Sequence, residues 1–204
     1  MAKKPIEKFM TPFGVLQKYA YIVKPSTKFD DAGVYEFKLE FAGEDAKTMK
    51  KYIDGCMKKS LEDSGKDKAA PAPYTINKDD KTLTVKFKLK ASIKTRKGDI
   101  WERSIALYGP KGGKVTKPKM YAEGTELRVN MTPYLWFAGS MGAGVTLQPL
   151  AVQFRKVVEW NPEMVNEFEA VEGYESSDVF TAADGQMEPP ANSTSDDEED
   201  EFDF

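Results

Sequence analysis

Lysines at alternate positions are the residues of this chain whose types and spacing most directly suggest a chemistry. Lys86, Lys88 and Lys90 follow one another in steps of two, and Lys94 comes four residues later. Residues two apart in a strand share a face, so these ammonium groups are expected to form one row. Such a row can contact the phosphates of a nucleic acid, or it can simply keep a sheet edge soluble and unpaired.

A second stretch, 125–137, combines cations with aromatic rings. Leu127, Val129 and Met131 take the inner positions of a strand. The outer positions then hold Arg128, Asn130, Thr132, Tyr134 and Trp136. Single-stranded nucleic acids require cations for their phosphates and rings for their unstacked bases. We therefore predict Arg128 as a DNA contact and Tyr134 and Trp136 as stacking residues; the alternative is that both rings cover the end of the core.

Three further residues are candidates for the same binding surface. Lys3 and Lys4 stand on an N-terminal arm, where they could contact phosphates or only aid solubility. Tyr21, like Tyr19, falls on an outer face if the neighbouring apolar residues point inward, and we include Tyr21 among the predicted DNA contacts. Trp101 could instead be core, because it shares its parity with apolar residues further along its strand.

The residue types that are missing exclude most enzymes. The chain has no histidine and a single cysteine, Cys56, which removes the usual general base, the common nucleophile pairs and the usual zinc ligands. The glycines and lysines of 109–114 lack the closing hydroxyl of a nucleotide-binding loop. We predict no enzyme, no cofactor and no metal site; a magnesium-dependent nuclease built from carboxylates alone stays as an alternative.

The elements that must position these residues are mostly strands. Strict alternation of apolar and polar residues predicts strands, and a spacing of three and four predicts one helix, over 44–64, that Gly65 ends. The predicted strands cover 15–23, 33–42, 82–95, 100–108, 125–137 and 144–160. Pro133 and Pro149 imply edges or bulges within the last two. This order predicts a mostly β fold, a small OB-fold-like β-barrel with one inserted α-helix.

The charge is divided sharply along the chain. Residues 1–158 contain all 30 basic residues and 17 acidic ones, a formal charge of +13, whereas the last 46 residues contain 16 acids and no base. We therefore predict a DNA-binding domain over 1–160 and a flexible acidic tail over 161–204, disordered from about 172 onward. The N-terminus has no apolar leader, and no run of residues reaches the length of a membrane span, so we expect a cytoplasmic protein with no membrane contact.

Several stretches in order along most of the chain resemble a known family. They are YAYIVKP (19–25), GVYEFKLEF (33–41), VKFKLKAS (85–92), TPYLW (132–136) and GAGVTLQ (142–148), followed by an acidic end that finishes in Phe. Together they are similar to the replicative single-stranded DNA-binding proteins of short-tailed lytic phages of the T-seven type. The helix-to-strand insertion and the tail of this chain are shorter than the family pattern.

The resemblance implies an OB-fold that binds single strands without sequence preference in phage DNA replication, recombination and repair. It implies contacts to DNA by Tyr134 and the N-terminal lysines, Lys3 especially, and a terminal aromatic role for Phe204. It further implies that the tail contacts the phage DNA polymerase and helicase-primase, that a homodimer can form, and that the protein acts in the cytoplasm of the infected bacterial host.

The chemistry of the tail agrees with a docking role. Its carboxylates can compete with DNA for the basic body, but charge alone does not select one partner. Rings amid carboxylates could enter an apolar pocket framed by positive charge. The predicted partner-binding residues are Asp200, Glu201, Phe202, Asp203 and Phe204. Two alternatives remain: a tail that only solubilises, and an interaction protein that mimics nucleic acid or chaperones basic proteins while its barrel is merely structural.

Overall fold

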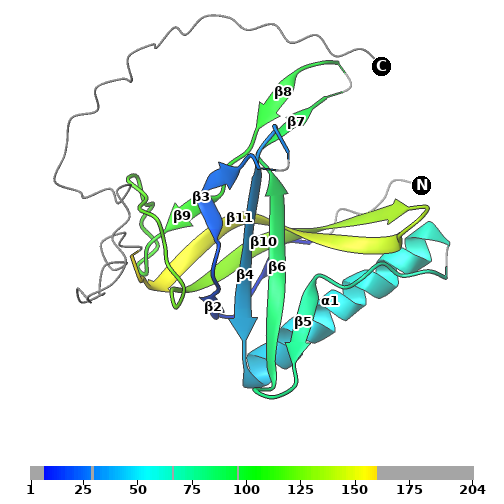
Figure 1. The fold of residues 1–204 in the computed structure, drawn as a ribbon, viewed down its shortest axis with the longest axis horizontal. Coiled ribbons are helices and arrows are strands. Elements are labelled where there is room, and N and C mark those ends of the chain that lie inside the picture. The colour runs from blue at the N-terminus through cyan, green and yellow to red at the C-terminus, as the bar shows by residue number, and fades with distance from the viewer. Residues whose placement is uncertain (1–6, 29, 66, 96, 160–204) are drawn as a thin grey trace, which may run out of the picture. The chain divides into compact units, whose positions relative to one another are not determined.

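Five strands close into a barrel in the computed structural model, which describes residues 7–159 except positions 29, 66 and 96. They are β2 (Gly14–Leu16), β4 (Val34–Phe41), β6 (Thr82–Lys90), β10 (Glu126–Ala138) and β11 (Gly142–Lys156). Around the barrel the order is β2, β4, β6, β11, β10 and back to β2 (Figure 1). All pairs are antiparallel except β6 with β11, which are parallel. This order confirms the predicted OB-fold-like barrel.

The barrel is filled by the apolar residues that alternate along its strands. On β4, Phe37, Leu39 and Phe41 are almost fully buried, and the ring of Phe37 stacks on Phe87 of β6 with centroids 5.1 Å apart. β10 and β11 supply inner residues in the same way, including Met131 and Leu147. Because each inner residue has polar neighbours of opposite parity, the polar side chains of these strands lie on the outside of the barrel.

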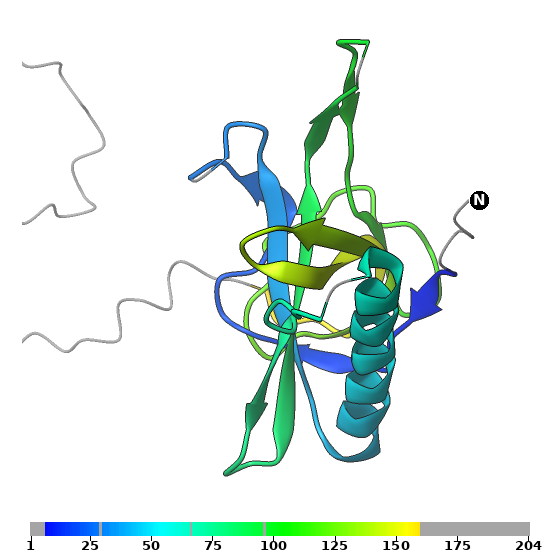
Figure 2. The ribbon, with the colours of Figure 1, turned by 90° about the vertical axis from the view of Figure 1, so that its right-hand side faces the viewer.

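One helix, α1 (Gly43–Ser64), is present among the described residues, as predicted. It buries Met49, Ile53 and Met57 and ends at Gly65, whose φ of 62° is the left-handed conformation that glycine adopts without steric cost. Figure 2 shows α1 beside the far end of the β10–β11 hairpin. Ser60 fixes this contact, because its hydroxyl lies 2.9 Å from the carbonyl oxygen of Gly144 and 3.2 Å from that of Trp136.

Two of the predicted strands are interrupted. The stretch 15–23 divides into β2 and β3 (Tyr21–Ser26), because Tyr19 adopts a left-handed backbone with φ of 62°. The stretch 100–108 divides into β8 (Ile100–Glu102) and β9 (Ala106–Tyr108). The predicted barrel strand 82–95 ends at Lys90, and β7 (Ser92–Lys94) instead pairs with β8 in a separate two-stranded sheet that projects from the barrel (Figure 1).

Two strands were not predicted. β1 (Phe9–Met10) pairs with β10, and β5 (Tyr74–Asn77) pairs with β6.

Pro133 and Pro149 lie at an edge and at a bulge, as predicted. The register of β10 and β11 shifts next to Pro149, where Leu150 is the extra residue of a bulge, and Pro133 lies beyond the two residues at which β1 pairs with β10.

Candidate nucleic-acid interface

The pairing of β6 with β11 brings polar residues of three strands together on the outside of the barrel. Phe87 and Leu147 are partners and both are buried. Their neighbours of opposite parity, Lys86 and Lys88 on β6 and Thr146 and Gln148 on β11, therefore lie next to each other on the outer side. Thr146 is in turn the cross-strand partner of Tyr134 on β10, and Gln148 is the partner of Thr132. We call this outer surface of β6, β11 and β10 the barrel face.

The three lysines of β6 lie on the barrel face, as predicted, but they are not equivalent. Lys86 forms an ion pair of 2.7 Å with Glu36, and Lys90 forms one of 3.1 Å with Asp30. The hydrogen bond from Lys90, aided by the backbone N–H of Ala32, lowers the pKa of Asp30, so this carboxylate stays charged and opposes the lysine.

Lys88 lies between these two ion pairs and is exposed. Within the described part of the chain, no carboxylate lies within ion-pair distance of its ammonium group. The row of lysines is therefore partly neutralised by β4 and by the loop before it. Lys88 is opposite Glu36 in the β4–β6 register and helps to lower the pKa of Asp30, but both carboxylates form their ion pairs with the neighbouring lysines, so Lys88 has the most available charge of the three.

Arg103 joins the barrel face although the sequence pattern did not select it. Its Nε donates to the carbonyl oxygen of Lys90 at 2.9 Å, and one terminal nitrogen lies 3.5 Å from Oε1 of Gln148. Partial burial lowers the pKa of its guanidinium, which nevertheless remains charged at neutral pH. Arg103 lies in the short connection between β8 and β9, where no periodicity marks a residue as facing the barrel.

Tyr134 and Trp136 share the outer parity of β10, so Pro133 does not change the register. Tyr134 is 57% exposed and its ring is open to solvent. Trp136 is half-buried: its indole lies against Gly144, and its Nε1 donates to Thr146 at 3.1 Å. Tyr134 thus meets the requirement for a stacking residue. Trp136 has the predicted outer position, but its ring packs onto the hairpin, which agrees in part with the alternative that these rings cover the core.

Arg128 also has the predicted outer parity, but its side chain is engaged at the other end of β10. Its Nε donates to Gln153 at 2.9 Å, and its guanidinium lies 5.1 Å from the centroid of the Phe13 ring. Arg155 approaches the same ring at 4.6 Å and pairs with Glu126. The two guanidiniums add positive charge to the outer surface of β10 and β11, at a distance along the strand from Tyr134.

The structure separates Lys94 from the other lysines. We expected it to continue the row, with Ile93 pointing inward; instead both are exposed on β7, outside the barrel. Trp101, opposite Ile93 on β8, is 66% exposed, which corrects the interpretation that it could be core. Both changes have one cause: after Lys90 the chain leaves the barrel, and the backbone N–H of Ala91 donates to Gly33.

Tyr21 lies on β3, opposite Glu36, and is 39% exposed. Together with Tyr19, Glu36 and Lys88 it lines a groove of about 310 Å³ beside the barrel face. The predicted outer position of Tyr21 is therefore confirmed, and the groove connects it to the most available lysine.

The remaining predicted site residues, Lys3, Lys4 and the tail 200–204, lie outside the described residues. Among the described residues, no group of three His, Cys, Asp or Glu side chains could hold a metal ion. No helix in the same part of the chain is long and apolar enough to cross a bilayer.

No protein-family model and no curated protein matches the chain, but solved structures do. One is gp2.5, a single-stranded DNA-binding protein encoded by bacteriophage T7, with a TM-score of 0.69 and 22% identity over 84% of this chain and 100% of that one. Another is the single-stranded DNA-binding protein from bacteriophage Enc34. Its C-terminal truncation matches with a TM-score of 0.52 and 14% identity over 78% of this chain and 98% of that one.

The Enc34 protein has also been solved in complex with single-stranded DNA. That structure matches with a TM-score of 0.53 and 16% identity, over 74% of this chain and 88% of that one. Each match spans most of both chains. The chain therefore has the OB-fold of phage single-stranded DNA-binding proteins.

Proposed function

We propose that this chain binds single-stranded DNA without sequence preference and acts in phage DNA replication, recombination and repair. The observation that carries the proposal is the barrel face, where the exposed ring of Tyr134 on β10 and the charge of Lys88 on β6 lie on either side of β11. A ring and a cation on one open surface suit a flexible single strand, whose bases are free to stack and whose phosphates lie close by. The shared fold supports the same ligand.

The proposed DNA contacts are those predicted from the sequence, with Arg103 added. They are Lys3, Lys4, Tyr21, Lys86, Lys88, Lys90, Lys94, Arg103, Arg128, Tyr134 and Trp136. In the described part of the chain, no helix offers the row of base-reading side chains that a major-groove protein needs, since α1 packs on the barrel and mixes acids with its lysines. We infer binding through backbone contacts and stacking, and no enzymatic activity.

We further propose that the acidic tail recruits phage replication enzymes, the DNA polymerase and the helicase-primase among them. Asp200, Glu201, Phe202, Asp203 and Phe204 would form the docking peptide. The tail would also compete with DNA for the basic body when no single strand is bound. In this proposal the protein works in the cytoplasm of the infected host and can form a homodimer.

The first test is a fluorescence titration of the full chain. Trp136 neighbours the proposed stacking residue, so its emission should be quenched when a base stacks nearby. A mixed-sequence single-stranded oligonucleotide and the matching duplex are compared over a series of salt concentrations. We expect tighter binding of the single strand and a negative slope of log K against log salt, about 0.7 per phosphate contacted. If neither nucleic acid binds even at low salt, the proposal fails and the acidic tail becomes the functional end of the protein.

A further inference from the structure

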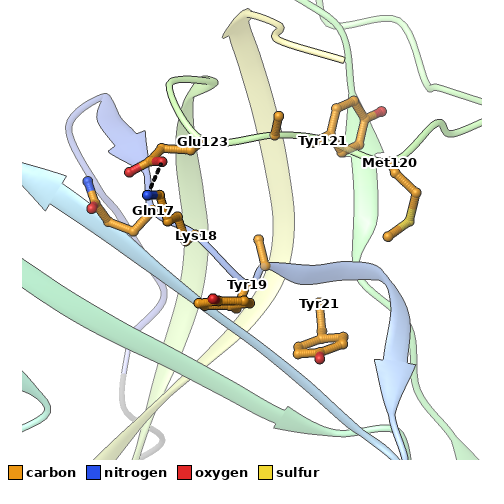
Figure 3. Close-up of a pocket in the computed structure, with 9 residues that line it drawn as sticks. Gln17, Lys18, Tyr19, Tyr21, Met120, Tyr121 and Glu123 are labelled. Atoms are coloured by element: carbon orange, nitrogen blue, oxygen red, sulfur yellow. Dashed lines mark ion pairs between the residues drawn. The ribbon is translucent and has the colours of Figure 1, made fainter. Parts of the chain in front are cut away.

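Two hollows lie on either side of one exposed ring. The first, which we call the tyrosine pocket, has a volume of about 430 Å³ and is lined by residues 17–21 and 120–123 (Figure 3). The second is the groove of about 310 Å³ that runs to Lys88, which we call the lysine groove. Tyr19 and Tyr21 line both. The two hollows therefore meet at these two residues.

Tyr19 is presented to solvent by an unfavourable backbone. Its φ of 62° lies in the left-handed region that side chains with a Cβ rarely adopt, and its side chain is 87% exposed. The flanking chain is held on both sides: the N–H of Gln17 donates to Lys38 at 3.0 Å, and Tyr21 pairs with Glu36. The exposed ring itself buries almost nothing, so its packing does not explain the conformation. Unfavourable backbone geometry of this kind is often found at binding sites.

The walls of the tyrosine pocket offer the contacts that a nucleobase requires. Tyr21 and Met120 supply apolar surface and are 39% and 45% exposed. The rim is polar, with Gln17 and with Lys18, whose ammonium group pairs with Glu123 at 3.7 Å. Figure 3 shows the rings of Tyr19 and Tyr21 on one side of the pocket and Met120 extending toward them. A flat ring with polar edges can stack inside such a pocket while its edges face amide, ammonium and carboxylate groups.

We propose that Tyr19 separates two consecutive bases of a bound single strand. One base enters the tyrosine pocket against Tyr21 and Met120, and the other lies in the lysine groove, where Lys88 contacts its phosphate. Both hollows are near the lower limit of small-ligand pockets, which suits one base each. Because Lys88 also belongs to the barrel face, the strand continues from this site toward Tyr134. This inference rests on the proposed function and adds a site to it.

Photo-cross-linking locates the bases directly. An oligonucleotide carrying 5-iodouracil at successive positions is irradiated in complex with the full chain, and the modified residues are identified by mass spectrometry. We expect cross-links to Tyr19 or Met120 from one set of positions and to Tyr134 from another. Cross-links at Tyr134 with none at Tyr19, Tyr21 or Met120 would overturn the inference and leave the proposed function intact.

The variant Tyr19→Gly tests the same site by affinity. Glycine accepts a positive φ, so the melting temperature should not fall, whereas loss of the ring should weaken single-strand binding about tenfold. Tyr19→Phe keeps the ring and should keep the affinity. Ile76→Ala, which removes an exposed apolar side chain on β5, is the matched control and should bind as the unmodified chain does.

The remaining outcomes separate the inference from the function on which it rests. Unchanged affinity of Tyr19→Gly, when the unmodified chain binds, contradicts the inference alone. If Tyr19→Gly instead weakens binding of a peptide of residues 192–204 and leaves oligonucleotide binding unchanged, the pocket takes a protein ligand and the inference is wrong. If the unmodified chain binds no oligonucleotide, the proposed function fails and the inference fails with it.

Discussion

Lys86 and Lys88 are alike in the sequence and differ in the folded protein. They are two residues apart on β6 and share a face, but Lys86 lies 2.7 Å from Glu36, whereas no described carboxylate pairs with Lys88. An exposed ion pair contributes little to stability, but it still occupies the charge that a phosphate would otherwise meet. A ligand that binds Lys86 must displace or share Glu36. Lys88 is the cross-strand partner of Glu36, but Glu36 forms its ion pair with Lys86, so a ligand that binds Lys88 has no ion pair of Lys88 to break.

This difference predicts unequal effects of two matched substitutions. Lys88→Ala should weaken single-strand binding more than Lys86→Ala and should reduce the log-salt slope by about 0.7, because one phosphate contact is lost. The measurement is a fluorescence titration of each variant at several salt concentrations. Equal losses for the two variants would show that Glu36 does not limit Lys86 and would contradict the argument from the ion pair.

At the scale of elements, the β10–β11 hairpin depends on α1 for its position. The hairpin extends beyond the barrel, and its far end lies beside the helix (Figure 2). Ser60, only 3% exposed, reaches the carbonyl oxygens of both strands at the level of Trp136 and Gly144. Tyr134 lies two residues before Trp136 on β10, so we expect the helix to help position its ring.

Ser60→Ala should therefore affect both stability and binding. Removing the hydroxyl leaves buried carbonyl groups without this partner, and the free energy of unfolding should fall by about 1 to 3 kcal/mol. Ser64→Ala is the matched control, since its hydroxyl bonds only to Leu61 within the same helix. Urea unfolding measures the first effect, and single-strand affinity, which should also fall as the hairpin loosens, measures the second. If Ser60→Ala is no less stable than Ser64→Ala, the helix does not hold the hairpin in this way.

At the scale of the whole molecule, the division of charge is the dominant property. Residues 1–158 carry a formal charge of +13 and the remainder −16, so the near-neutral total conceals two strongly charged parts. A polyanion is attracted to the first part and repelled by the second. Since both interactions are screened over about 10 Å at 0.1 M salt, any competition between tail and DNA must weaken as salt is added.

Deleting residues 196–204 should therefore tighten single-strand binding at low salt and have a smaller effect at high salt. The same deletion should abolish binding to the phage DNA polymerase, measured by surface plasmon resonance. Phe204→Ala retains the charges and should leave DNA affinity unchanged while it weakens the polymerase interaction. Unchanged affinity of the deletion variant at low salt would rule out competition by the tail, and equal losses of both activities in Phe204→Ala would contradict separate roles.

The sequence by itself determined the class of fold and the faces of the long barrel strands. Alternation and helical spacing are local properties, so β4, α1, β6, β10 and β11 could be predicted within a few residues, as could the outer positions of Tyr134 and Lys88. β5 was missed because its residues are all partly or fully exposed and show no inward alternation. The charge division is likewise a property of the sequence alone.

Only the tertiary structure decided which of these residues act together. The pairing of β4 with β6 placed Glu36 opposite Lys88 and within ion-pair distance of Lys86, and the departure of the chain after Lys90 removed Lys94 from the row. Closure of the barrel brought Arg103 to Gln148, and it brought Met120 to Tyr19, about a hundred residues away. The physical reason is that periodicity records only which side of its own element a residue takes, whereas ion pairs and pockets depend on the register between elements far apart in the chain.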